Sequence, residues 1–361
     1  FVIYFLGREL FSPIVGFCAS LALLSTPWFL FRARSGNLDI ILTFFFVLTF
    51  LFAFKTIKNK IWVTPLAVSF TALALTKSVV PFTILPAIIL IFWGSSYKIK
   101  ELILTFSLFF TIFGGWILLQ LGIKSDFIKH YLNIGAPEVN VMSSYLENLA
   151  TLKQFLHSGI GKWFWPSIIS IFVSLFLMQR RFLALSVFSL VFLVPFIFSQ
   201  RGQIWHLIPV YPIIILNFLG LAYFFLQKVT NKKIIVSLVL LVGTTYISFI
   251  QIRSSWYQFI DIPSFVSDEA ILSRHAKLYP HQTLYIDGDF IPTAVFYSDK
   301  KVSQIWFDAL GEIFSKKGQI LLITKQERLD GAKIPKDAYE ILKTDRDRIL
   351  ILKKISAFNL P

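Results

Sequence analysis

The sequence has few charged residues for its length. Asp, Glu, Lys and Arg make up 15% of its 361 residues, whereas soluble domains average about 25%. Hydrophobic residues make up 56%, and the mean hydropathy is +0.70. Because so few charges cannot cover the surface of a soluble protein of this size, the composition indicates a polytopic membrane protein.

Cysteine and the common nucleotide- and metal-binding motifs are also scarce or absent. The one cysteine, Cys18, excludes an intrachain disulfide, and its apolar surroundings predict a packed or lipid-facing side chain. The sequence contains no P-loop, no dinucleotide-binding fingerprint and no Cys/His spacing typical of a zinc site. No cofactor is therefore indicated with certainty.

The sequence begins with FVIYFLGREL, which lacks an initiator Met and the charged segment that starts a signal peptide. We interpret this stretch as the end of a membrane helix and expect the sequence to be truncated at its N-terminus.

Long apolar runs alternate with short polar segments up to residue 251. They predict an all-α membrane domain, 1–251, with about nine to ten spans, one of them broken or re-entrant around Lys77. After Arg253, the short β-like runs TLYID, QILLIT and RILILKK alternate with helical segments, so 252–361 is expected to form a small soluble α/β domain. The spans are expected near 1–6, 11–31, 38–54, 61–76, 79–94, 101–122, 163–179, 182–199, 204–226 and 234–251.

The net charge of +15 would suggest nucleic-acid binding in a soluble protein. Here the basic residues cluster in short loops on one side of the predicted spans, which marks that side as cytoplasmic and makes nucleic acid an unexpected partner. The outer loop 123–162 and the domain 252–361 then lie outside a bacterial cytoplasmic membrane. The clusters assigned to the cytoplasmic side are Arg8; Lys55, Lys58 and Lys60; Lys98 and Lys100; Arg180 and Arg181; and Lys228, Lys232 and Lys233.

A second set of polar residues falls on the outer side, where topology does not require them. Ionisable groups at membrane depth are costly and usually face a functional cavity. Several predicted helices deliver such groups to this side, which suggests a single outward-facing site. The residues are Arg32, Arg34, Asn37, Asp39, Lys77, Arg201, Gln203 and His206.

The stretch FRARSGNLDIILTFF, 31–45, concentrates four of these residues. Asn37 is placed to cap a helix that starts near Leu38, and Asp39 falls in the first turn of that helix, where an ionised carboxylate is favoured. Arg34 and Asp39 could form a structural ion pair. Alternatively, Asp39 could orient an acceptor or help to bind a divalent metal ion, with Arg34 available for a phosphate oxygen.

Three of the other four residues are cations or a histidine. Lys77 could extend its amine to the membrane surface or neutralise a phosphate there. Arg201 offers a bidentate grip on phosphate, and His206 could be a metal ligand, a proton carrier or a merely interfacial residue. The neighbouring Trp205 and Tyr211 suit an interfacial aromatic belt.

Two further features are an amphipathic segment in the outer loop and a pair of aspartates in the C-terminal domain. Segment 143–157 is expected to be an amphipathic helix on the membrane surface or over a lipid-linked substrate, with Tyr145, Leu149, Leu152 and Leu156 on its apolar side. Asp287 and Asp289 resemble a metal-binding pair, but a strand followed by a turn accounts for them better.

Together these elements resemble bacterial membrane glycosyltransferases of the C-type (GT-C) fold. The nearest families are the aminoarabinose transferases of lipid A and the protein O-mannosyltransferase-like enzymes. The resemblance covers about residues 1–226 and includes the segments LTKSVVP and RGQIWHLIPVYPIIIL. Its most specific part is the set Arg34, Asp39, Leu42, Thr43 and Phe44.

The resemblance implies a polyprenyl-phosphate-linked sugar as donor, with a hexosyl or pentosyl group moved to a lipid, glycan or protein acceptor, as in lipid A modification of the cell envelope. It places Asp39 at the family's second acidic position. It assigns Arg34, Asn37, Lys77, Arg201 and His206 to substrate binding. The family's first acidic residue, usually the catalytic base, lies in an outer loop that would precede Phe1, so we expect this sequence to lack it.

Two other functions remain open from the sequence. A transporter or flippase of a lipid-linked glycan would place its polar groups near the bilayer midplane and often shows inverted repeats, whereas here the polar groups gather on one side and no repeat is evident. A non-catalytic scaffold that displays the C-terminal domain would leave Arg34, Asp39 and Lys77 without a role.

Overall fold

The structure, a computed structural model, divides the chain into two compact units. The membrane unit is Phe1–Phe259 and the C-terminal unit is Ile260–Pro361. The described residues are 1–34, 36–77, 79–93, 98–133, 145–198, 204–256, 268–287, 291–306, 309–316 and 318–354.

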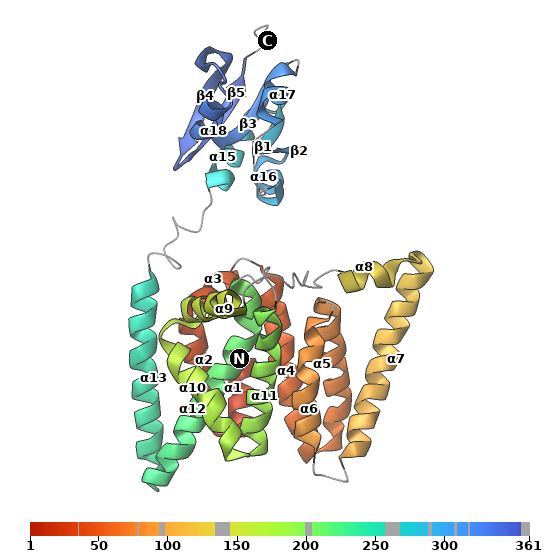
Figure 1. Ribbon diagram of the computed structural model, residues 1–361, viewed down its shortest axis with the longest axis vertical. Helices are drawn as coiled ribbons and strands as arrows, with labels where there is room; N and C mark the ends of the chain where they lie inside the picture. Colours follow the sequence, from red (N-terminus) through yellow and green to blue (C-terminus); the bar gives the residue numbers. More distant parts are fainter. Residues whose placement is uncertain are drawn as a thin grey trace. The chain divides into compact units, whose positions relative to one another are not determined.

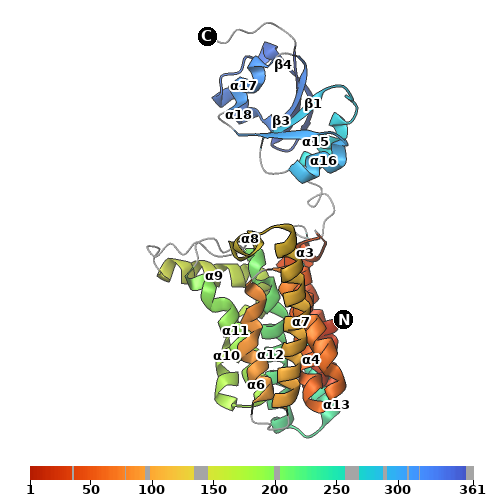
Figure 2. The same cartoon turned by 90° about the vertical axis from the view of Figure 1, so that its right-hand side faces the viewer.

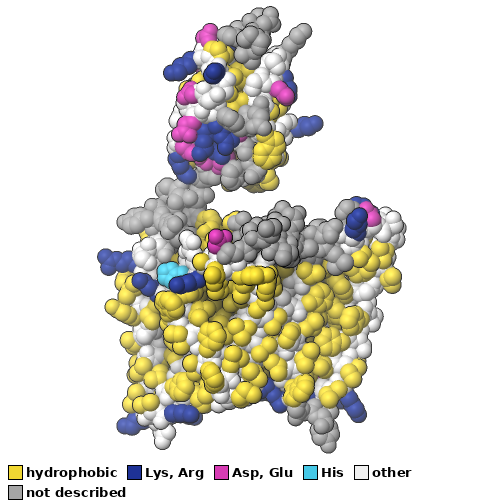
Figure 3. Space-filling view, viewed as in Figure 1, with side chains coloured by type: hydrophobic (Ala, Val, Ile, Leu, Met, Phe, Trp, Pro, Cys, Tyr) yellow, Lys and Arg dark blue, Asp and Glu magenta, His cyan; other side chains and the backbone are white. Residues whose placement is uncertain are grey.

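The membrane unit is built from helices that lie side by side, with α3, α8 and α9 at one end of the bundle (Figures 1 and 2). Hydrophobic side chains fill the band between the two ends, and Lys and Arg side chains lie at both rims (Figure 3). The α-helices are α1 (Val2–Leu10), α2 (Pro13–Ser25), α3 (Pro27–Arg34), α4 (Leu38–Lys58), α5 (Val63–Thr76), α6 (Leu85–Phe92), α7 (Ile99–Ile123), α8 (Phe127–Asn133), α9 (Tyr145–Ile160), α10 (Phe164–Leu177), α11 (Arg180–Ile197), α12 (Tyr211–Val229) and α13 (Lys233–Ser255). The 3-10 helices are η1 (Lys60–Trp62), η2 (Val80–Ile84), η3 (Gly161–Trp163) and η4 (Ile204–Val210).

Six helical segments in the described part of the chain are long and apolar enough to cross a membrane, or up to seven if the bent pair α2–α3 counts as one. The runs expected at 61–76 and 79–94 form the shorter apolar helices Lys60–Thr76 and Val80–Phe92. The break expected around Lys77 lies between the end of α5 and the start of η2. The prediction of an all-α membrane domain followed by a small α/β domain is confirmed.

The span expected at 11–31 is bent. α2 ends at Ser25, α3 begins at Pro27, and the two helices meet at 76°. Proline has no N–H and disfavours a helical conformation in the residue before it, which is why Thr26 is extended. The carbonyl of Ser25 accepts a hydrogen bond from Gln251 Nε2 at 2.9 Å, so this backbone group is satisfied inside the bundle. The bend places α3, with its two arginines, at one end of the bundle.

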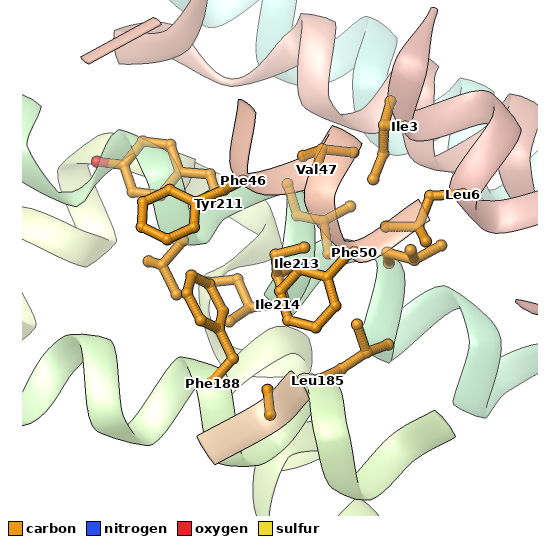
Figure 4. Close-up of a cluster of buried hydrophobic side chains, with 14 of the residues drawn as sticks. Ile3, Leu6, Phe46, Val47, Phe50, Leu185, Phe188, Tyr211, Ile213 and Ile214 are labelled. Atoms are coloured by element: carbon orange, nitrogen blue, oxygen red, sulfur yellow. The ribbon is translucent and has the colours of Figure 1, made fainter. Parts of the chain in front are cut away.

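The centre of the bundle is an aromatic and aliphatic core that joins α1, α4, α11 and α12 (Figure 4). The Phe188 ring lies 5.1 Å from that of Phe46 and 5.2 Å from that of Phe50. Tyr211 is fully buried here, and its hydroxyl donates to the Ile204 carbonyl at 3.4 Å. The prediction that Tyr211 belongs to an interfacial belt is therefore wrong, because the residue lies on the inward side of α12.

Helices α1 and α2 approach each other at two glycines. A Cβ atom on Gly7 would lie 2.5 Å from the Gly16 Cα, and one on Gly16 would lie 2.3 Å from the Tyr4 carbonyl oxygen. Both obstacles are backbone atoms, which cannot move aside as a flexible side chain can. Small residues that let helix backbones touch are a general device of membrane helix packing.

We expect Gly16→Val to destabilise the membrane unit strongly, since α1 and α2 must separate to accommodate it. The expected outcome is loss of about half or more of the monodisperse protein after detergent extraction, measured by fluorescence-detected size exclusion. Gly114→Val in α7 is the matched control, because a Cβ there meets nothing within 4 Å. Equal yields for the two variants would contradict the close α1–α2 packing.

The C-terminal unit is a five-stranded mixed sheet with helices on both faces. The strand order is β2-β1-β3-β5-β4; β1 pairs in parallel with β2 and β3, and β5 is antiparallel to β3 and β4. Helices α15 and α16 contribute to the core on one face, and α17 and α18 to the core on the other. The strands are β1 (Thr283–Asp287), β2 (Val302–Ile305), β3 (Ile320–Lys325), β4 (Tyr339–Asp345) and β5 (Arg348–Lys353). The helices are α15 (Asp268–Ala276), α16 (Ile291–Ser298), α17 (Leu310–Ser315), α18 (Gln326–Gly331) and the 3-10 helix η7 (Lys336–Ala338).

Asp287 ends β1 and is buried by protein contacts. Its carboxylate accepts a hydrogen bond from Thr324 Oγ1 at 2.7 Å and forms an ion pair with Arg328. Arg348 donates to its backbone carbonyl at 3.0 Å. These partners give Asp287 a structural role, in line with the strand-and-turn interpretation; Asp289 lies outside the described residues.

Candidate functional site

Asp39 is fixed in the first turn of α4 by local hydrogen bonds. The side chain of Asn37, the N-cap, accepts from the Asp39 N–H at 2.7 Å, as the sequence predicts. Gly36 precedes it with φ +65°, a left-handed conformation that glycine adopts without strain. Thr43 Oγ1 donates to the Asp39 carbonyl at 2.5 Å. The Asp39 side chain, 6% exposed, is therefore held at one end of the bundle.

Lys77 forms an ion pair with this buried carboxylate. Its Nζ lies 2.8 Å from Asp39 Oδ1, and its side chain is 21% exposed. Lys77 is the extended C-cap of α5, so the pair joins the end of α5 to the start of α4. The sequence suggested Arg34 as an ion-pair partner of Asp39, and the structure shows Lys77 in that role. The Lys77 amine therefore does more than extend to the membrane surface.

Arg32 and two tryptophans form a second cluster at the same end. The Arg32 guanidinium lies 4.2 Å from the Trp205 ring centroid and 5.4 Å from that of Trp28. The ring centroids of Trp28 and Trp205 are 6.1 Å apart. A guanidinium over an indole face is attracted by the ring quadrupole. The Arg32 guanidinium therefore links α3 to the 3-10 helix η4.

His206 lies close to both of these groups of residues. Its ring centroid is 6.0 Å from that of Trp205, and it is close enough to Lys77, Asp39 and Arg32 to interact electrostatically with all three. The structure thus brings together residues from α3, α4, η4 and the end of α5, which we call the charged end cluster: Arg32, Asp39, Lys77 and His206.

The remaining predicted site residues have more peripheral positions. Arg34 is exposed at the end of α3, and Asn37 serves as the helix cap. Arg201 lies outside the described residues. The sequence placed Arg32 among the polar residues of the outer side but did not assign it to substrate binding. Trp28 and Arg32 are four residues apart on one helix and so share a face; that spacing was the available signal.

Helix α9 packs against α3, η4 and α11 next to the cluster. Asn148 is buried and donates to the Ile197 carbonyl at 3.0 Å, and Leu152 and Leu156 are buried beside it. Tyr145 and Leu149, which were expected on the same face, are exposed at 55% and 48%. The predicted apolar face was therefore right for Leu152 and Leu156 and wrong for Tyr145 and Leu149, and the hydrogen-bonded Asn148 is part of the buried face instead.

The charged end cluster contains more side chains that can be positively charged than negatively charged ones. Arg32 and Lys77 are cations, His206 can become one, and Asp39 supplies the one carboxylate among the four. Within the described residues, no group of three or more His, Cys, Asp or Glu side chains is placed to hold a metal ion. Such a cluster suits an anionic oxygen, above all a phosphate, better than a metal.

Comparison with known proteins identifies the fold. No family model and no curated protein sequence matches the chain. Among solved structures, apo ArnT from Cupriavidus metallidurans aligns over 97% of this chain and 80% of its own, with 14% identity and a TM-score of 0.67. The same protein bound to undecaprenyl phosphate aligns over 97% and 81%, with 13% identity and a TM-score of 0.66. The chain therefore has the fold of ArnT, a GT-C fold, as the sequence resemblance predicted.

Proposed function

We propose that the protein is a membrane glycosyltransferase that takes its sugar from a polyprenyl-phosphate donor. The observation that carries this proposal is the charged end cluster, Lys77 on Asp39 with Arg32 and His206 beside them, at one end of a bundle with the ArnT fold. ArnT is a lipid A aminoarabinose transferase, and it has been solved with undecaprenyl phosphate. A lipid-linked donor also needs no nucleotide-binding motif, in agreement with the sequence.

In the proposed reaction the donor phosphate binds the cations of the cluster. Lys77, His206 and Arg32 of the cluster hold its oxygens, and Asn37 and the first turn of α4 line the site. Arg34 and Arg201 keep the substrate-binding role that the sequence resemblance implies for them, as further cations for the phosphate. The bond between the sugar C1 and the phosphate oxygen breaks, and a bond from C1 to the acceptor hydroxyl oxygen forms. The acceptor proton passes to a carboxylate, for which Asp39 is the candidate, and polyprenyl phosphate leaves with the electron pair.

The position of the cluster favours an enzyme over a transporter. Asp39 is the second residue of the 21-residue helix α4, and Lys77 follows the last residue of α5. Both therefore lie at a helix end, whereas the substrate sites of transporters lie near the middle of the bilayer. The proposed acceptor is a lipid, glycan or protein hydroxyl, and the proposed sugar is a hexose or a pentose.

The donor class can be tested with the purified protein in lipid nanodiscs. We expect undecaprenyl phosphate to raise the thermal midpoint in a concentration-dependent way, and undecaprenol, which has the same tail without the phosphate, to have little effect. A labelled polyprenyl-phosphate sugar should then be consumed only when an envelope extract supplies the acceptor. Equal stabilisation by both lipids, or movement of the labelled lipid across the bilayer without cleavage, would refute the proposal.

We further propose that the cluster and the C-terminal unit are on the extracytoplasmic side of the inner membrane, following the distribution of basic loops. The single cysteine, Cys18, is buried, so introduced cysteines can report topology. We expect Asp337→Cys, at an exposed position of the C-terminal unit, to react with a membrane-impermeant maleimide in spheroplasts. Lys60→Cys, also exposed, should react only after lysis; the reverse pattern would contradict the proposed orientation.

A further inference from the structure

The membrane unit contains a second charged region, at the other end of the bundle from the charged end cluster. There the ends of α1 and α4 and the start of α11 surround a cavity of about 480 Å³. Helix α4 connects the two regions: it begins with Leu38 and Asp39 at the charged end cluster and ends with Lys58 at the cavity. At 1.5 Å per residue, its 21 residues separate them by about 30 Å.

The cavity has an apolar part and a basic part. Leu10, Phe54 and Ile57 supply the apolar lining. Lys58, Arg180 and Arg181 supply three positive charges against the single carboxylate of Glu9. The Glu9–Lys58 ion pair, at 2.5 Å, satisfies that carboxylate and leaves the two arginines as the excess charge.

Arg181 is held rigidly at the edge of the cavity. Its Nη1 donates to the Leu10 carbonyl at 2.9 Å and its Nη2 to Gln179 Oε1 at 3.3 Å. Its guanidinium also lies 5.0 Å from the centroid of Phe11. A guanidinium has five N–H donors, so these two bonds fix its position and leave donors for an anion.

Arg180 adds a more accessible charge at the start of α11. Its side chain is exposed, and within the described residues neither Arg180 nor Arg181 forms an ion pair with a carboxylate. Arg180 is the first residue of an 18-residue helix whose N-cap, Gln179, makes no side-chain cap bond. The positive end of the helix therefore reinforces the two arginines.

We infer that this cavity binds the phosphate of an anionic phospholipid, such as phosphatidylglycerol, in the adjacent membrane leaflet. Arg180 and Arg181 contact the phosphodiester, and an acyl chain lies along Leu10, Phe54 and Ile57. Basic pockets between helix ends and next to apolar surface have the chemistry that such headgroups require. The lipid links the ends of α1, α4 and α11, and this site is separate from the one proposed for the sugar donor.

The inference can be tested by native mass spectrometry of the full chain with equimolar phosphatidylglycerol and phosphatidylcholine. The wild type should retain phosphatidylglycerol preferentially, and Arg180→Gln should lower its retention about fivefold, as expected for one basic residue near a lipid surface. Lys100→Gln is the matched control, because it removes a charge from an exposed residue of α7 that does not line the cavity. It should change retention less than about twofold.

A variant that binds more lipid excludes misfolding as the reason for a change in retention. Glu9→Gln removes the one acid of the cavity and frees Lys58, so it should raise phosphatidylglycerol retention about fivefold. Millimolar inorganic phosphate should not displace the lipid, because free phosphate gains nothing from the apolar lining. Equal effects of Arg180→Gln and Lys100→Gln, no gain with Glu9→Gln, or displacement by inorganic phosphate would each overturn the inference.

Discussion

Membranes that contain the Asp39→Asn variant are expected to transfer sugar roughly tenfold more slowly than wild-type membranes, or slower still. The amide keeps the shape of the side chain and leaves the backbone bonds at Asn37 and Thr43 unchanged. It removes the charge that pairs with Lys77 and the group that we propose to receive the acceptor proton. The measurement is the initial rate of label transfer from a polyprenyl-phosphate sugar to envelope acceptor, normalised to the amount of protein.

Asp126→Asn is the control for this variant. Asp126 is a half-exposed acid that follows α7, and it pairs with Lys124 at 3.7 Å on the surface. Its replacement should leave transfer within about twofold of the wild type, because exposed ion pairs contribute little. A wild-type rate with Asp39→Asn, at normal membrane insertion, would remove Asp39 from the reaction.

The Lys77→Met variant is expected to lose stability as well as activity. Methionine removes the cation and leaves the Asp39 carboxylate, 6% exposed, without its partner. Loss of one member of a buried pair costs about 3–5 kcal/mol. Because Lys77 is itself 21% exposed, we expect the lower end of this range, seen as a fall of about 5 °C or more in the thermal midpoint in detergent.

The double variant Lys77→Met/Asp39→Asn separates stability from function. It contains neither charge, so no carboxylate is buried alone, and most of the lost thermal stability should return. Stabilisation by undecaprenyl phosphate should stay weak, because the proposed phosphate contact is still missing. If the double variant recovers both the thermal midpoint and the stabilisation by undecaprenyl phosphate, Lys77 acts only as a structural partner of Asp39. If it recovers neither, loss of the ion pair is not the reason that Lys77→Met is less stable.

Much of this fold can be predicted from local sequence. The apolar runs identify the membrane helices, since the bilayer core requires about 20 apolar residues in a helix that satisfies its own backbone. The strands β1, β3 and β5 are equally clear, because they are short and apolar. Strands β2 and β4 were not predicted, because β2 has four residues and β4 is mostly exposed at a sheet edge, where polar side chains are common.

The candidate site could be predicted in part. Asn37 as a helix cap follows from turn chemistry over three residues, and the gathering of polar residues at one end follows from counting spans. The sequence could not identify Lys77 as a partner of Asp39, because the two residues are 38 positions apart and meet only when α4 packs against α5. The sequence could not predict the contact between Arg32 and Trp205 either, because it forms only when the bend at Pro27 directs α3 toward η4.

Taken by itself, the sequence determined that this chain is a membrane protein, where its helices lie and which polar residues lack a topological reason to be there. These properties depend on transfer of side chains into lipid and on local backbone chemistry, which act over one or two turns. Only the tertiary structure decided which charges meet, that Asn148 is buried in α9 while Tyr145 and Leu149 are exposed, and that a basic cavity lies at the end of the bundle away from the charged end cluster. Those features depend on packing between helices distant in the chain, where one bend or one glycine contact changes which side chains come together.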